Sequence, residues 1–293
     1  MIKSTNFVIP TVIGLLLFSG CGRKSNDANS LQIKGSDTMV NLGQAWAEEY
    51  MKQSPGKSIA VTGGGSGTGI TALINSTCDI AEVSREMKES EIELIASKGA
   101  APKKIIVALD GLAVVVNPAN KISELTIDQL ADIFTGKIKN WKEVGGRNAK
   151  IVLLSREVNS GTHVYFKEHV LRHGKADGKE EFAAEALLLS SSQAIADEVA
   201  QNQDAIGYYG MGYITAKEKA LRVAKDKISP YEAPTMENVI SGAYPISRPL
   251  LMYTKGEPLG LAKTFIDYVL SPAGQQVVKK LDFVPVKPLE QSK

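Results

Sequence analysis

The chain has 293 residues, and its 34 lysine and arginine residues nearly balance its 32 aspartate and glutamate residues, for a formal net charge of +2. This balance excludes the basic surface of a nucleic-acid-binding protein, so any bound anion must be held by local donors. The length is ample for one large unit or two smaller lobes.

The N-terminal segment predicts a lipoprotein leader over residues 1–20. Its apolar run, Phe7–Phe18, is too short for a comfortable membrane span and ends just before Cys21. The site resembles a bacterial lipobox, although phenylalanine replaces the usual leucine, and the resemblance implies acylation of Cys21. An ordinary signal peptide with an accidental cysteine is the alternative. Residues 21–30 are then a flexible tether. Because acylation would occupy Cys21, no disulfide framework is expected, and Cys78 is expected in the core.

Apolar β-branched runs alternate with helical patterns along the rest of the chain. This alternation predicts an α/β protein with mostly parallel central sheets. The expected strands cover residues 31–35, 58–63, 104–117, 150–156, 205–210, 249–254 and 283–286. A helix over 39–53 is indicated by Leu42, Trp46 and Tyr50, which recur every four residues. N-cap signals predict four more helices, at Ser90 with Glu93, Thr126 with Gln129, Ser190 with Gln193, and Ser271 before Pro272.

The stretch GGGSGTGI, residues 63–70, is rich in glycine. Gly64 and Gly69 have the spacing of a P-loop, but Ile70 stands where the lysine is needed, and no register fits the dinucleotide pattern. Glycines let backbone N–H groups turn toward an anion, and a helix expected over residues 70–75 would add its N-terminus. The loop alone is equally consistent with a flexible turn.

Two long apolar runs predict two lobes. The run over 104–117 contains Gly111 and would cross from one lobe to the other, and a run near residue 250 would cross back. The first lobe is therefore predicted as residues 31–112 and 252–293, and the second as 113–251. A ligand is expected in the cleft between them.

Four segments share one chemistry, since each has hydroxyls or glycines between a strand end and a helix start. An oxyanion held in a cleft needs such donors in place of water, and arginine adds a planar fork for two oxygens. Taken singly, each segment is an ordinary cap or turn. The segments offer Ser36 and Thr38; Ser66, Gly67 and Thr68; Ser84 and Arg85; and Arg156, Ser160, Gly161 and Thr162.

The motifs GSDTM, GGGSGTG, DIAEVSREM, SREVNSGTHVYF and AIGYYGMGYI occur in an order that resembles the phosphate-binding, PstS-like periplasmic substrate-binding proteins. The likeness covers almost all of residues 31–293. It implies a two-lobe type II periplasmic-binding fold that closes on inorganic phosphate. It also implies an ABC permease with its ATPase as partner, a place on the extracytoplasmic side of the cell envelope, and a monomer without cofactor or metal.

The resemblance also implies the phosphate contacts. These are Thr38, the backbone N–H of Met39, Ser66, Arg156, Ser160, Gly161 and Thr162, with Ser36 as a further candidate. Ser84 and Arg85 join the expected contacts through the chemistry of their own segment.

Arg85 departs from the best-known family pattern. Some members have there an aspartate that accepts the proton of HPO4²⁻ and so rejects sulfate, which has none. Asp110 or Asp37 is a candidate for the missing acceptor, and Arg85 could instead pair with Asp79 or Glu86 outside the site. Sulfate, molybdate or tungstate is therefore the alternative ligand.

Two alternatives to a transport receptor stay open. An enzyme acting on phosphate esters could use Ser66 or Ser160, although no orienting carboxylate with a clear role accompanies Ser160 and His163. A sensor could keep the fold without transport. His169 and His173 have metal-ligand spacing but no evident third ligand, so no metal is expected.

Overall fold

The computed structural model describes residues 28–175 and 177–286. The predicted leader and the acylated Cys21 lie outside this part, as does most of the tether, since β1 begins at Ser30. Within the described residues, no helix combines the length and apolar character needed to cross a bilayer.

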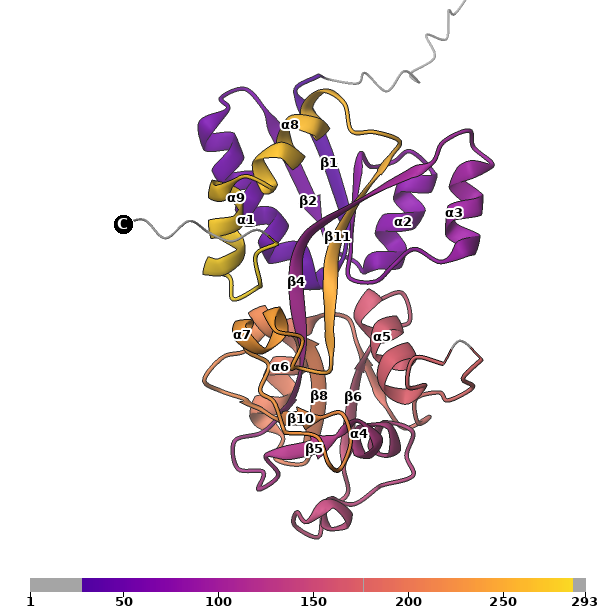
Figure 1. The fold of residues 1–293 in the computed structure, drawn as a ribbon, viewed down its shortest axis with the longest axis vertical. Helices are drawn as coiled ribbons and strands as arrows, with labels where there is room; N and C mark the ends of the chain where they lie inside the picture. The colour runs from indigo at the N-terminus through magenta and orange to yellow at the C-terminus, as the bar shows by residue number, and fades with distance from the viewer. Residues whose placement is uncertain (1–27, 176, 287–293) are drawn as a thin grey trace, which may run out of the picture.

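Two groups of elements stand one above the other and are joined by two long strands, β4 and β11 (Figure 1). The upper lobe contains β1 (Ser30–Gly35), α1 (Asp37–Gln53), β2 (Ser58–Thr62), α2 (Ser66–Ile74), β3 (Ile80–Val83), α3 (Glu89–Ala96), α8 (Gly260–Val269) and α9 (Pro272–Lys280). The crossing strands are β4 (Pro102–Val116) and β11 (Ser247–Lys255).

The lower lobe contains the remaining elements. These are β5 (Glu124–Thr126), α4 (Ile127–Phe134), η1 (Trp141–Val144), β6 (Val152–Arg156), α5 (Gly161–Phe166), η2 (Lys167–Leu171), β7 (Leu187–Leu189), α6 (Ser192–Gln201), β8 (Ala205–Gly210), η3 (Met211–Tyr213), β9 (Lys219–Ala220), β10 (Arg222–Ala224) and α7 (Met236–Ile240).

Nine strands among the described residues form one mixed sheet, in the order β2-β1-β3-β11-β4-β8-β6-β7 with β9 also on β4. The α/β class is confirmed, but the expectation of mostly parallel sheets holds only inside each lobe. There β1 pairs in parallel with β2 and β3, and β6 with β7 and β8. Around the crossing strands the pairs are antiparallel, because the chain passes down along β4 and returns along β11.

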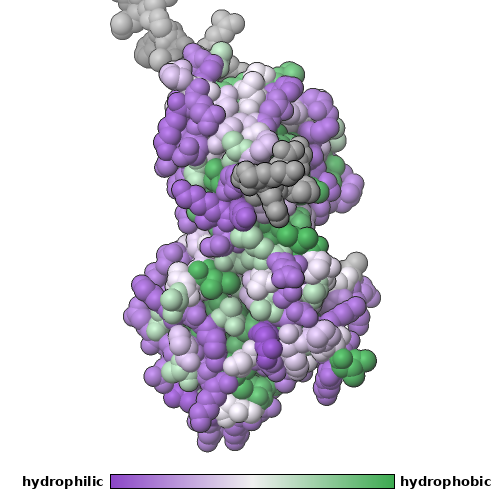
Figure 2. All heavy atoms as spheres, turned by 60° about the vertical axis from the view of Figure 1, so that its left-hand side comes forward, coloured by the Kyte–Doolittle hydropathy of each residue, from purple (hydrophilic) through white to green (hydrophobic). Residues whose placement is uncertain are grey.

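The predicted lobe boundaries, 112/113 and 251/252, fall inside the two crossing strands. Gly111 of β4 lies opposite Ser247 of β11 at the waist, and β11 already pairs with β3 at Leu251. Figure 2 shows two lobes separated by a narrower waist. Their surface is largely hydrophilic in this view, and hydrophobic residues gather at the waist. The exact boundaries stay predictions.

Several helix starts differ from their sequence signals. The caps at Thr126 and Ser271 are confirmed, but α6 is capped by Ser191 rather than Ser190. Helix α3 is capped at Lys88, two residues before the predicted Ser90 cap, because Glu91 reaches back to the backbone N–H of Lys88. Helix α2 begins four residues early, at Ser66, so the second half of the glycine loop is its first turn.

Buried side chains hold the lobes together along the sheet. One apolar cluster runs under α1, α6, α8 and α9 and therefore spans both lobes, while separate clusters lie under α2 and α3 and within the lower lobe. Cys78 is buried in the cluster under α2, as predicted. The shared cluster makes the waist a packed joint.

Glu82 is an ionisable residue that is buried in the upper lobe. Its side chain packs against Gly43 of α1, is 1% exposed, and its Oε1 has no hydrogen-bond partner in the described part of the chain. Burial raises the pKa of Glu82 from 4.5 to about 8, because the carboxylate would lose its water without gaining a partner.

We expect stability to fall by about 1.4 kcal/mol per pH unit between pH 6.5 and 8 through Glu82 alone. In this window the folded state keeps the Glu82 proton while the unfolded state has lost it, so unfolding releases a proton. Below pH 6.5 the buried His163, whose pKa is lowered to about 4, opposes the trend. Urea unfolding across the window should show that Glu82→Gln removes this slope and that the exposed Glu93→Gln does not. An unchanged slope in Glu82→Gln contradicts the prediction.

Candidate functional site

Three loops of the upper lobe bring hydroxyl groups to one point. Ser36 follows β1, Ser66 starts α2 and Ser84 follows β3, so the three serines come from the carboxyl ends of neighbouring strands. Ser36 Oγ donates to Ser84 Oγ at 3.1 Å, and Ser66 Oγ lies 3.3 Å from Ser84 Oγ. All three are buried. The sequence placed these residues in separate segments, and the sheet brings them together.

The lower lobe meets these serines through the start of α5. Thr162 Oγ1 lies 2.8 Å from Thr38 Oγ1 in the first turn of α1, so the two lobes touch through hydroxyls. At Gly161, a Cβ atom would lie only 2.3 Å from Ser66 Oγ and 2.6 Å from Ser84 Oγ. Only glycine therefore lets α5 approach the upper lobe this closely. We call Ser36, Thr38, Ser66, Ser84 and Thr162 the hydroxyl cluster.

Arg248 supplies the positive charge of this cluster. Its Nη2 donates to Thr162 Oγ1 at 3.0 Å and to Thr38 Oγ1 at 3.4 Å, and its Nη1 donates to the Ser84 carbonyl at 2.9 Å. The side chain lies on β11 at the waist and is buried. A guanidinium among hydroxyl groups from both lobes gives the cluster donors suited to an oxyanion.

Asp110 on β4 balances Arg248. Its Oδ2 accepts from Arg248 Nη2 at 2.9 Å and from Nε at 3.1 Å, and its Oδ1 accepts from the Met211 backbone N–H at 3.0 Å. Burial raises the pKa of Asp110, and Arg248 opposes that shift. The candidate proton acceptor Asp110 is therefore linked to the hydroxyl groups through the Arg248 side chain, which donates to both.

The Arg156 side chain forms a second contact between the lobes, with Asp37 of the upper lobe. Its Nη1 lies 3.1 Å from Asp37 Oδ2 and donates to Ser192 Oγ at 3.0 Å. Asp37 also accepts from the Ser192 backbone N–H at 2.8 Å, at the start of α6. Asp37, the other candidate proton acceptor, is thus engaged by Arg156 and Ser192. The residues on either side of it, Ser36 and Thr38, belong to the cluster.

Arg85 is placed differently from the expectation. Its two terminal nitrogens form a forked pair with Glu91, at 2.7 and 2.8 Å, and one also donates to the Glu86 carbonyl. The pair is largely buried, and a buried guanidinium is held strongly by a two-oxygen partner. The Arg85 charge is therefore directed at Glu91 rather than at the hydroxyl cluster, and neither expected carboxylate, Asp79 or Glu86, is its partner.

Two of the expected contacts, Met39 and Ser160, already take part in hydrogen bonds at helix starts. The backbone N–H of Met39 donates to the Ser36 carbonyl at 3.1 Å within the first turn of α1, so that donor is already used. Ser160 caps α5 by accepting from the His163 backbone N–H at 3.4 Å. The His163 ring is buried and lies 3.3 Å from Ser155 Oγ. The Ser160 hydroxyl is therefore bonded to the backbone of His163, while the His163 ring contacts Ser155.

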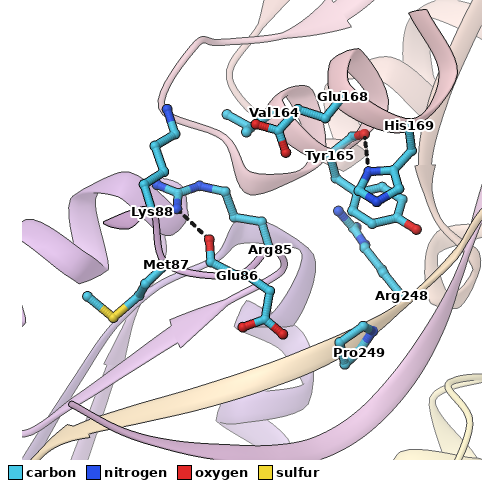
Figure 3. A pocket seen from close by; sticks show the side chains of 10 residues that line it. All are labelled: Arg85, Glu86, Met87, Lys88, Val164, Tyr165, Glu168, His169, Arg248 and Pro249. Atoms are coloured by element: carbon cyan, nitrogen blue, oxygen red, sulfur yellow. Dashed lines mark hydrogen bonds between the residues drawn. The ribbon is translucent and has the colours of Figure 1, made fainter. Parts of the chain in front are cut away.

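A cavity of about 430 Å³ lies beside the cluster, between the segment from Arg85 to Lys88 and helix α5 (Figure 3). Arg248 forms part of its wall and stands 5.5 Å from the centre of the Tyr165 ring, which stacks on His169. His169 is therefore engaged with Tyr165, while His173 lies 3.8 Å from Asp128. Among residues 28–175 and 177–286, no cluster of three potential metal ligands occurs.

A family model described as a PBP superfamily domain matches residues 23–273. The phosphate-binding protein PstS of Bacillus subtilis (strain 168) is 35% identical over 290 residues, which cover 93% of this chain and 90% of that protein. The PstS protein of Borreliella burgdorferi (strain ATCC 35210 / DSM 4680 / CIP 102532 / B31) is 31% identical over 274 residues, covering 92% and 95%. The chain belongs to the PstS family of the PBP superfamily.

Solved structures agree with this PstS assignment. An ABC transporter substrate-binding protein from Clostridium perfringens with bound phosphate matches with a TM-score of 0.79 and 35% identity, over 88% of this chain and 100% of that chain. An ABC-type phosphate transport receptor from Vibrio cholerae matches with a TM-score of 0.70 and 31% identity, over 88% and 100%. The two-lobe fold expected from the sequence is confirmed.

Sequence reasoning missed Arg248, although a signal was present. Asp110 interrupts the apolar run over 104–117, and Arg248 directly precedes the apolar run over 249–254. A charged residue inside a buried strand needs a partner of opposite charge, and these two strands were expected to lie at the same waist. In this PstS-family chain, these two charged residues are partners.

Proposed function

We propose that this chain is an extracytoplasmic receptor that binds inorganic phosphate with high affinity between its lobes and delivers it to the permease of an ABC importer. The observation that carries the proposal is the hydroxyl cluster, in which buried hydroxyls of both lobes converge on Arg248. The names of the relatives and the phosphate bound in the Clostridium perfringens structure support this ligand.

The proposed contacts are the hydroxyl cluster, Arg248, and the Ser160–Gly161 turn. Arg156 belongs to the same set, because its partner Asp37 lies between Ser36 and Thr38. An anion bridging donors of two lobes favours the closed arrangement over the open one, as a receptor requires. We propose further that the protein acts as a monomer without catalysis, anchored to the membrane through an acylated Cys21.

Calorimetric titration with phosphate and then sulfate, after bound anion has been stripped, tests the proposal. Tight phosphate binding with weak sulfate binding supports it. Sulfate or molybdate binding as strong as phosphate binding would mean another oxyanion is the ligand, and the phosphate assignment would fall.

Asp110 is the proposed reader of the ligand proton. We expect Asp110→Asn to lower the ratio of phosphate to sulfate affinity by at least about tenfold, because the carboxylate that repels an unprotonated oxyanion is gone. The ratio is the useful readout, since any loss of stability affects both titrations alike. Asp37→Asn is the matched control and should leave the ratio unchanged. Full phosphate preference in Asp110→Asn would exclude this role.

A further inference from the structure

The glycine loop does more than present Ser66. The backbone N–H of Gly67 donates to the Asn159 carbonyl at 2.9 Å, and Asn159 Nδ2 donates to the Gly64 carbonyl at 2.8 Å. The same Nδ2 lies 3.4 Å from Thr68 Oγ1. Asn159 belongs to the lower lobe, between β6 and α5, so these bonds join the two lobes.

The glycines of this loop make room for Asn159. A Cβ atom on Gly65 would lie 2.9 Å from the Asn159 carbonyl oxygen, and one on Gly67 would lie 3.2 Å from it. Gly64 and Gly65 also have φ values of 114° and 95°, which side-chain-bearing residues rarely adopt. Gly65 and Gly67 are therefore explained by the close approach of Asn159, and Gly64 and Gly65 by the backbone shape of the loop, without reference to a nucleotide.

This contact lies directly beside the candidate anion contacts. Asn159 precedes Ser160 and Gly161, and Gly65 and Gly67 flank Ser66. Since the bonding groups come from different lobes, opening the cleft must break their bonds. Each of these hydrogen bonds therefore stabilises only the closed form.

We propose that Asn159 is a positioning residue and that residues 64–68 form its socket, a latch that holds the lobes closed over the anion. This inference rests on the proposed function as far as the anion is concerned. Phosphate enters the open form, in which the latch is broken, and leaves only after the latch breaks again. The latch therefore slows dissociation and does not speed association.

Stopped-flow measurement of phosphate association and dissociation tests the latch. Asn159→Ala should raise the dissociation rate about threefold to tenfold, the effect of one lost hydrogen bond, with the association rate constant within about twofold of the original. Val158→Ala is the matched control, because Val158 is on the same loop and 70% exposed. An unchanged dissociation rate in Asn159→Ala, or a loss confined to association, overturns the proposal.

Gly67→Ala provides a second variant that should fold. Gly67 lies in the first turn of α2, where alanine is the better helix former, so a loss of affinity points to the crowded Asn159 carbonyl. Its dissociation rate should also rise, and an unchanged rate counts against the socket.

Hydrogen exchange of the Gly67 amide separates this inference from the proposed function, because that amide reports the latch without a ligand assay. If the protein does not bind phosphate, the proposed function fails. A protected Gly67 amide that loses protection in Asn159→Ala then still supports the latch, and unchanged protection overturns it.

Discussion

Replacing Arg248 with methionine is expected to destabilise the protein by about 3–5 kcal/mol and to abolish measurable phosphate binding. The guanidinium and the Asp110 carboxylate are both fully buried, so the substitution leaves a buried negative charge without its partner. It also removes the donor shared by Thr38 and Thr162. Urea unfolding measures the first effect, and calorimetric titration with phosphate measures the second.

Arg147 offers a matched control on the surface. It pairs with Asp204 at 2.6 Å, but its side chain is 50% exposed, so Arg147→Met should cost less than about 1 kcal/mol and leave binding intact. Removing both charges, with Arg248→Met and Asp110→Leu, should recover much of the stability but not the binding. A loss in Arg248→Met no larger than that in Arg147→Met would refute the role assigned to the buried pair.

Gly161→Ala is expected to weaken phosphate binding by about 10- to 100-fold while leaving the free energy of unfolding nearly unchanged. The added methyl group would meet Ser66 Oγ at 2.3 Å and Ser84 Oγ at 2.6 Å, both across the cleft. The lobes must then stay apart by a small distance, which weakens every contact that bridges them. The three atoms nearest to the added methyl group all belong to the upper lobe, and alanine is a better helix former than glycine at the start of α5.

Gly63→Ala is the control for this substitution. It adds the same methyl group to the glycine loop, but its neighbour, Val40, would be 3.6 Å away, an ordinary contact. Its phosphate affinity should stay within about twofold of the original. Titration of both variants decides the matter, and an affinity of Gly161→Ala within that same range would show that the approach of α5 to the serines does not govern binding.

Local signals in the sequence were enough for most of the elements. The cap at Thr126 and the proline after Ser271 act on backbone groups within one turn, so the structure repeats them. The signal at Ser90 failed because Glu91, one residue on, binds both the Lys88 N–H and the Arg85 guanidinium. Two acceptors competed for one helix start, and the ion pair of Glu91 with Arg85, six positions before it, decided between them.

The residues of the candidate site also fall into two groups, those that local patterns predict and those that they do not. Ser36, Ser66, Ser84 and Thr162 could be predicted because each stands in a recognisable local pattern between a strand and a helix. Arg248 could not be assigned to them, since its partners Thr162, Asp110 and Thr38 are 86, 138 and 210 positions away in the chain. No pattern of neighbouring residues carries that information.

Short-range patterns of polarity, turns and caps were sufficient to predict the α/β class, the two crossing strands, the family and the hydroxyl residues. The directions of the Arg85, Arg156 and Arg248 side chains depend on long-range packing and became visible only in the folded chain. Arg85 turns to Glu91, Arg156 to Asp37, and Arg248 to Asp110 and the hydroxyl cluster. A guanidinium at the end of a long side chain can reach several carboxylates, and which one it takes depends on which of them folding buries beside it.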